Sequence, residues 1–503
     1  MNVAFTNASL WPSAGNLTAF TTLYKALPAS LPGSANTEAW AKAAASLLPL
    51  LRGEAAGAFV VPAQYTTLAG KLPGFHAGPD PIATADPTCA SPVCPAPAQV
   101  IATSTFPVPS ALPPHNWDTM GGKLFIHGCK TEGLFNATEL ALAAKFGLLT
   151  VEKGQGLALP GFADVKMAAI AAQWKAARRK ASLEEGWALF YLNAHFDWPF
   201  FAIHAEMEAH PGWPQQLGGA SSGDPCLGHG DSSFPQPAEG MLLFNHSHKP
   251  VRAAFIGACV NAIKHGFDGC FIDSAAPVTA EMLQPLAKSC GNCTTCCQPC
   301  STSYAAVAAA ATGKNQVMVE LQEAVGDGKL IVAKDSFQGG SEGAVNTIFP
   351  LDTFCSCYSC NWSSTHPLEK FRRLHTTYAE ICQTQILEAI RLGQRGQVVL
   401  LHGEVNSAWI SADQPQALKD DFEFALAAFL IASSETAFFG YSNGWYYNGT
   451  TWHAEYDRKL GAPTALAKQG EGMSNMSWSR AFASGTTVEL DVLRRTAAIH
   501  WAK

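Results

Sequence analysis

Short apolar segments alternate with longer amphipathic ones from about residue 121 onward. Almost continuous apolar runs are typical of parallel strands that are buried on both faces. Eight such runs occur, at 123–128, 148–154, 188–195, 269–275, 329–335, 345–351, 398–405 and 436–441. Helical spacing of apolar residues separates most of them, at 137–146, 162–180, 250–266, 304–325, 368–393 and 417–432. Eight β–α repeats in one chain predict an α/β protein with a closed (β/α)8 TIM barrel.

The two ends of the chain depart from this repeat. Residues 1–120 are rich in Ala, Pro, Ser and Thr, and they predict an N-terminal extension that packs on the barrel. Residues 121–445 form the predicted barrel, and residues 446–503 alternate apolar with polar positions around turns, which predicts a small C-terminal antiparallel β unit. An open doubly wound sheet is the alternative, but it usually carries a glycine-rich phosphate loop, and neither common pattern of that loop is present.

Composition and charge narrow the class of protein. The 503 residues are 48% apolar and 15% charged, with a net charge of −7, which suits a large core. Without a dense basic run we expect no nucleic-acid partner, and the cluster Lys175, Arg178, Arg179 and Lys180 is interpreted as the solvated face of a helix. Without an apolar run of about 20 residues we expect no membrane span. Neither a cofactor nor a metal is predicted.

Cysteines and glycosylation sequons point to the secretory route, although no leader is visible, so we expect a mature or truncated secreted, lumenal or cell-surface form. N-linked glycans are expected because the N-x-[S/T] pattern occurs at Asn7, Asn16, Asn136, Asn245, Asn292, Asn361, Asn448 and Asn475. The segment from Cys290 to Cys300 predicts a loop held by disulfides, with a zinc or an iron–sulfur site as alternatives. Cys259 and Cys270 are interpreted as small buried apolar residues. Because 15 cysteines is an odd number, at least one thiol stays unpaired within the chain.

The polar residues that end the predicted strands carry the candidate chemistry, because the active site of a TIM barrel lies at that face. Cleavage of a glycosidic bond typically uses two carboxyl groups that flank it. The candidate catalytic residues are Asp273, Glu404 and Asp335. The candidate substrate-binding residues are Glu152, Lys130, His127, Asn193, His195, Trp198, Lys334, Asp352, His402 and Trp445. By contrast, Asp268 precedes Gly269 in a tight turn and is interpreted as structural. Metal binding by His246, His248 and Asp273 stays open as a minor alternative.

The stretch FNHSHKPVRAAFIGACVNAIKHGFDGCFIDSA (244–275) resembles glycoside hydrolases of (β/α)8-barrel fold, with a distant similarity to alpha-amylase-like and alpha-galactosidase-like barrels. The segments 145–156, 188–206 and 455–490 resemble further parts of the same hydrolases, so that the likeness covers about 121–503. The resemblance implies that Asp273, on the fourth strand, is the nucleophile. In such barrels the sixth strand often supplies a Glu as the acid, whereas this chain offers only Asp352.

The leading hypothesis is therefore a glycosidase that acts on a poly- or oligosaccharide, with Asp273 as nucleophile or base and Glu404 or Asp335 as general acid. One alternative is a carbohydrate-binding protein on a barrel that has lost its activity. A second is a redox or metal protein organised by the Cys290–Cys300 segment.

Overall fold

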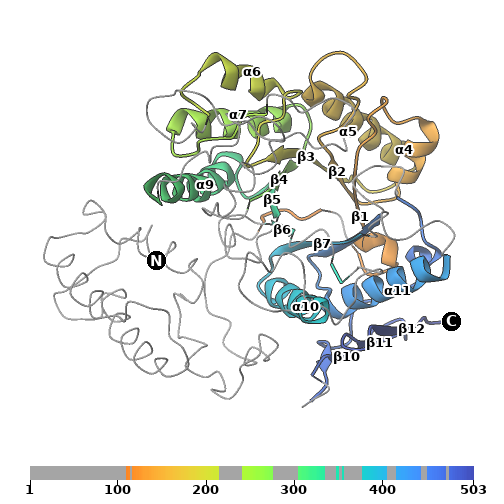
Figure 1. Cartoon of the computed structure of the whole chain (residues 1–503). Coiled ribbons are helices and arrows are strands. Elements are labelled where there is room, and N and C mark those ends of the chain that lie inside the picture. The colour runs from red at the N-terminus through yellow and green to blue at the C-terminus, as the bar shows by residue number, and fades with distance from the viewer. Residues whose placement is uncertain are drawn as a thin grey trace, which may run out of the picture.

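Eight parallel strands form the centre of the molecule in the computed structural model, which describes residues 109–113, 116–214, 241–275, 304–334, 347–349, 354–355, 377–404, 415–442, 450–471 and 475–503. The strands lie in the order of the chain, β1 to β8 (Figure 1). Their bounds are β1 Phe125–Gly128, β2 Leu148–Val151, β3 Trp187–Asn193, β4 Gly269–Asp273, β5 Leu330–Lys334, β6 Thr347–Phe349, β7 Val398–Glu404 and β8 Ala437–Ser442. A parallel bridge between Leu124 and Phe439 joins the first strand to the last. The predicted α/β fold with a TIM barrel is thus confirmed.

Helices surround these strands (Figure 1). The described ones are α4 Ala137–Ala143, α5 Ala163–Lys180, α6 Ala202–Ala209, α7 Lys249–Lys264, α9 Tyr304–Val325, α10 Tyr378–Gln394 and α11 Pro415–Ala432. The predicted start of α10 at residue 368 was wrong. The Thr377 side chain accepts a hydrogen bond from the Glu380 backbone, and the Glu380 carboxylate accepts one from the Thr377 backbone. This capping box starts the helix at Thr377, whose own backbone is extended.

Side chains along each strand alternate between the barrel interior and the helices. On β4, Phe271 faces inward, because its ring packs against the rings of His127 at 4.7 Å and Tyr191 at 6.1 Å. Asp273 lies two residues further on and therefore shares that side. Cys270 faces outward and forms a disulfide with Cys259 of α7. The interpretation of these two cysteines as unlinked apolar residues was therefore wrong, and the bond attaches α7 to the strand that carries Asp273.

The start of β4 explains the structural role expected for Asp268. Its carboxylate accepts a hydrogen bond from the Ala188 backbone at 2.9 Å and binds Lys175 at 2.6 Å. At Gly269 an added Cβ would lie 1.9 Å from the Leu330 carbonyl oxygen, so the close approach of β5 admits only glycine. The neighbouring basic cluster is not one solvated face, as expected, because Arg178 is 5% exposed and donates hydrogen bonds to the carbonyl oxygens of residues 144, 146 and 184.

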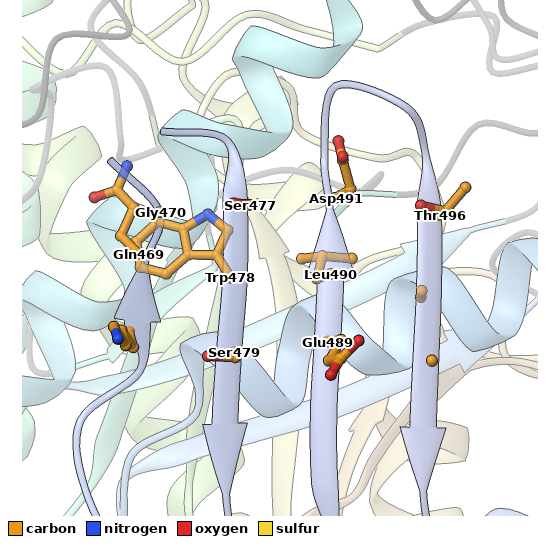
Figure 2. A pocket seen from close by; sticks show the side chains of 12 residues that line it. Gln469, Gly470, Ser477, Trp478, Ser479, Glu489, Leu490, Asp491 and Thr496 are labelled. Atoms are coloured by element: carbon orange, nitrogen blue, oxygen red, sulfur yellow. The ribbon is translucent and has the colours of Figure 1, made fainter. Parts of the chain in front are cut away.

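The C-terminal residues form the predicted antiparallel sheet, made of β9 Lys468–Gln469, β10 Ser477–Ala481, β11 Thr487–Asp491 and β12 Thr496–His500. A shallow groove of about 520 Å³ crosses it and is lined by polar side chains that include Ser479, Glu489 and Asp491 (Figure 2). None of the candidate site residues lines this groove.

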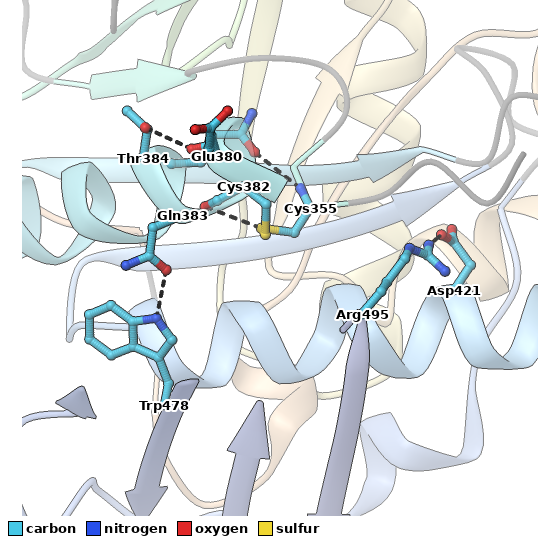
Figure 3. Close-up of a disulfide and its surroundings, with 9 residues drawn as sticks. Cys355, Glu380, Cys382, Gln383, Thr384, Asp421, Trp478 and Arg495 are labelled. Atoms are coloured by element: carbon cyan, nitrogen blue, oxygen red, sulfur yellow. Dashed lines mark hydrogen bonds and ion pairs between the residues drawn. A yellow bond between two sulfur atoms is a disulfide. The ribbon is translucent and has the colours of Figure 1, made fainter. Parts of the chain in front are cut away.

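Polar contacts attach this sheet to helices α10 and α11 (Figure 3). The Trp478 indole donates a hydrogen bond to the Gln383 side chain at 2.8 Å, and Arg495 binds the buried carboxylate of Asp421. Arg480 donates to the carbonyl oxygens of residues 430, 431 and 433, which are unsatisfied groups at the end of α11. A second disulfide joins Cys355 to Cys382 of α10. In the described part of the chain, no helix is long and apolar enough to span a membrane.

Candidate active site

Asp273 ends β4 at the centre of a polar cluster. Its Oδ1 lies 2.9 Å from Lys334 Nζ, at the end of β5, and accepts a hydrogen bond from the Ser274 backbone at 2.8 Å. Its Oδ2 accepts hydrogen bonds from the Tyr191 hydroxyl at 2.6 Å and from Asn193 Nδ2 at 3.2 Å. Tyr191 and Asn193 are two residues apart on β3, and Asn193 is the register partner of Asp273, so all these groups meet at one end of the barrel.

Glu152, directly after β2, forms the second carboxylate of the cluster. Its Oε1 lies 3.0 Å from Lys153 Nζ and 3.6 Å from His127 Nε2 at the end of β1. The Lys153 ammonium also lies over the rings of Tyr191, at 4.9 Å, and Trp198, at 5.2 Å. Glu152 is 3% exposed and Lys153 is 7% exposed, so this ion pair lies in the interior of the barrel mouth.

Charge compensation keeps both carboxylates ionised. Burial would raise the pKa of Asp273, but the positive charges of Lys334 and Lys153 and the hydrogen bond from Tyr191 lower it well below its usual range. Burial would likewise raise the pKa of Glu152, and there the charge of Lys153 and the neighbouring His127 imidazole lower it. The pKa of Tyr191 is raised far above its usual value, first by burial and then by the charge of Asp273, so its hydroxyl keeps the proton that it donates.

The backbone next to Asp273 is strained. Ser274 has a φ of 53°, a left-handed conformation that a residue with a side chain adopts only at a cost of about 1–3 kcal/mol. Asn193 Nδ2 also lies 3.3 Å from Ser274 Oγ, and Asn193 Oδ1 accepts hydrogen bonds from the His195 and Phe196 backbones. Asn193 therefore fixes both the strained turn after β4 and the turn after β3. Such strain is concentrated at functional sites.

Several candidate residues have other surroundings. Lys130 binds the Glu139 carboxylate of α4 at 2.9 Å, and Trp198 is only 4% exposed, so it has little ring surface for a sugar. His402 is buried on β7, where its Nε2 lies 2.8 Å from Ser442 Oγ. His195 is partly buried after β3, and burial lowers its pKa to about 3, which makes it a neutral imidazole.

The metal alternative that involved His246 has no support in this region. His246 Nε2 lies 2.9 Å from the Ala194 carbonyl oxygen. Among the described residues, no group of three His, Cys, Asp or Glu side chains could hold a metal ion.

Three candidates, Asp335, Asp352 and Trp445, lie outside the described residues, as does the Cys290–Cys300 segment. The backbone of Glu404 ends β7, in register with Ser442 of β8. The polar residues expected at the strand ends included Lys153, although it was not assigned to substrate binding, whereas Tyr191 was missing from them. Tyr191 could have been found, because it precedes Asn193 by two residues and therefore faces the same side of β3.

Comparison with known proteins identifies the family. A family profile described as "Hypothetical glycosyl hydrolase family 15" matches residues 187–486, whereas no curated protein matches the sequence. Among solved structures, the glycoside hydrolase domain of PelA from Pseudomonas aeruginosa is 12% identical, covering 63% of this chain and 93% of that chain, with a TM-score of 0.35. Ega3 from Aspergillus fumigatus, in complex with galactosamine, is 12% identical, covering 67% and 96%, with a TM-score of 0.33. The alpha-galactosidase TtGalA from Thermus thermophilus is 11% identical, covering 74% and 68%, with a TM-score of 0.38.

At these TM-scores the structural likeness is weak, and the family match identifies the chain. The matched residues make up more than half of the sequence and run from β3 to the turn before β11. The chain therefore belongs to hypothetical glycosyl hydrolase family 15, in agreement with the resemblance of its sequence to barrel-type glycoside hydrolases.

Proposed function

We propose that this glycosidase cleaves an O-glycosidic bond of a poly- or oligosaccharide with Asp273 as its nucleophile or base. The observation that carries the proposal is that Asp273, at the mouth of the barrel, is held as a carboxylate by Lys334, Tyr191 and Asn193. A nucleophile or base must be ionised to act, and a pKa below the usual range keeps it so over a wide pH range.

The general acid comes from another strand. Glycoside cleavage requires a protonated carboxyl next to the leaving oxygen, with a raised pKa. Neither Glu152 nor Asp273 meets that requirement, because lysines lower the pKa of both. We therefore assign the acid to Glu404, at the end of β7, or to Asp335, which follows Lys334 in the sequence.

Glu152, Asn193, Lys334 and His127 are assigned to substrate binding. Asn193 and Lys334 bind Asp273 directly, and His127 lies 3.6 Å from Glu152. We also propose that the enzyme works in an oxidising compartment, since disulfides such as Cys259–Cys270 persist there. N-linked glycans remain part of this proposal; the Asn136 sequon, for example, is exposed at the start of α4.

The test is the hydrolysis of a panel of chromogenic glycosides and polysaccharides by the intact chain and by Asp273→Asn. Asn keeps the shape of the side chain and removes its charge. We expect turnover to fall by at least about 10³-fold while the protein stays folded. Full activity in this variant would overturn the assignment. Glu404→Gln and Asp335→Asn then identify the acid, since the acid variant should lose the basic limb of the pH profile.

Binding without hydrolysis is the second candidate function, and one observation favours it. Asp273 receives four donors, from Lys334, Ser274, Tyr191 and Asn193, which occupy the acceptor positions of its two oxygens. A substrate must therefore displace one of them before Asp273 can attack. A glycan that binds the intact chain, with no glycoside of the panel cleaved, would establish this alternative.

A further inference from the structure

An exposed apolar lip lies beside the barrel mouth, from the loop after β2 to the first turn of α5. It consists of Leu159, Phe162 and Val165, which are 39%, 45% and 70% exposed. In the described part of the chain only Leu183, Leu466 and Leu493 are comparably exposed large apolar side chains, and they are scattered. Residues 157–163 carry no charge, and the two charged residues that follow, Asp164 and Lys166, have opposite signs. Clustered exposed apolar side chains on a soluble surface commonly mark a binding site.

Hydrogen bonds hold the lip against the next loop of the barrel. The backbone of Ala163, at the start of α5, donates a hydrogen bond to the Phe200 carbonyl oxygen at 2.9 Å. The Asp164 carboxylate accepts one from the Ala202 backbone at 3.0 Å. Loops that follow the strands of a barrel lie at its active-site face, so the lip and the loop after β3 form one rim.

Two stacked rings and a lysine lead from this rim to Asp273. Phe200 is partly exposed and stacks on Trp198 with 5.6 Å between ring centres and an angle of 18° between the rings. The Lys153 ammonium lies 5.2 Å from the centre of the Trp198 ring, and its charge acts on Asp273. Because Trp198 is 4% exposed, it supports Phe200 from below, and the accessible apolar surface belongs to Phe200 and the lip.

We propose that the lip is a remote binding site for a neutral polysaccharide, with Phe162 stacking on a sugar ring several units away from the cleaved bond. The occupant follows from the chemistry of the rim. Aromatic faces bind the apolar faces of sugar rings, and a lip without net charge matches an uncharged polymer. Its continuity with the candidate active site favours the substrate chain over an unrelated partner. The inference deepens the proposed function and rests on it for the identity of the polymer as substrate.

The test is affinity electrophoresis of the intact chain in native gels that contain soluble starch, galactomannan, xylan or mixed-linkage β-glucan, with anionic pectin as the charged comparison. We expect at least one neutral polymer to retard the protein. Phe162→Ala should weaken that retardation about two- to tenfold, because one stacking contact is lost. Phe162→Trp, which keeps a flat ring, should retain it, and Phe162→Leu should not. Leu493→Ala is the matched control, because Leu493 is 60% exposed on the C-terminal sheet.

Asp273→Asn separates this inference from the proposed function. It should keep the retardation while losing hydrolysis, so failure of the catalytic assignment leaves the binding result intact. The inference is overturned if no neutral polymer retards the protein or if Phe162→Ala leaves the retardation unchanged. It is also overturned if Phe162→Leu is retarded as strongly as the wild type. A change in oligomeric state on size-exclusion chromatography of Phe162→Ala would also overturn it, since the lip would then join two copies of the chain.

Discussion

Replacement of Lys334 by Met tests the charge compensation at Asp273. Lys334 Nζ lies 2.9 Å from Asp273 Oδ1, and each side chain is 14% exposed. Of the influences that lower the pKa of Asp273, the charge of Lys334 is the largest. Met has a similar volume and no charge, so Lys334→Met leaves the buried carboxylate with Lys153 as the remaining cation close enough to lower its pKa.

The expected cost at neutral pH is about 1.5–3 kcal/mol, the usual value of a hydrogen bond to a charged group. The pKa of Asp273 is lowered in the folded wild-type protein, so its ionisation stabilises the fold above the pKa of the unfolded chain, about 3.9. This stabilisation is lost as the pH falls through the folded pKa. In Lys334→Met the folded pKa is higher, so the variant takes up a proton at a pH at which the wild type does not. The difference in unfolding free energy between the wild type and Lys334→Met should therefore be largest at about pH 7 and should decrease between about pH 5 and pH 3.

Guanidinium unfolding at about pH 7 and about pH 3.5 measures this difference. Lys329→Met is the control, because Lys329 is 34% exposed and lies 3.7 Å from Asp268, a pair that should contribute no more than about 1 kcal/mol. The reasoning is refuted if Lys334→Met costs no more than the control, or if its cost is the same at both pH values.

Three further changes test the packing around the barrel. Cys259→Ala should cost about 2–3 kcal/mol in unfolding experiments, since it frees α7 from β4, and alkylation followed by mass spectrometry should then detect the Cys270 thiol. Arg495→Met should cost about 3–5 kcal/mol, because it leaves the buried carboxylate of Asp421, which is 0% exposed, without its cation; a melting temperature equal to that of the wild type would contradict this. Lys123→Met should stabilise the protein at about pH 6, because burial lowers the pKa of Lys123 to about 7, and the gain over the wild type should shrink as the pH rises from about 7 to 10.

The pattern of apolar residues predicted the barrel well, because short and almost continuously apolar segments are typical of parallel strands that are buried on both faces. The segment 269–275, for instance, is apolar on both sides, and β4 occupies 269–273 with Phe271 packed inside and Cys270 against a helix. Boundaries were less predictable where a side chain decides them. Apolar spacing continues before Thr377, but the capping box at Thr377 and Glu380 starts α10 there.

The disulfide between Cys259 and Cys270 shows what such patterns leave out. Both residues occupy positions that suit small apolar side chains, and nothing in their spacing of 11 residues distinguishes packing from a covalent bond. The distinction depends on how α7 lies against β4, which is a property of the tertiary structure. The same holds for Arg178, whose side chain finds three carbonyl oxygens of neighbouring loops instead of solvent.

The candidate site was predicted from the polar residues at the ends of the strands. In the structure, two acidic residues among them pair with lysines. Asp273 and Glu152 are each matched by a lysine, Lys334 and Lys153, so the described centre of the mouth carries two negative and two positive charges. A balanced centre gives an anionic or cationic sugar no net attraction, which agrees with a neutral substrate at both the mouth and the lip. The balance also constrains the chemistry. Because Asp273 and Glu152 are both held ionised, neither can protonate the leaving oxygen, and a third carboxyl group must do so. The variant of Glu404 or Asp335 that loses the basic limb of the pH profile would therefore identify the general acid.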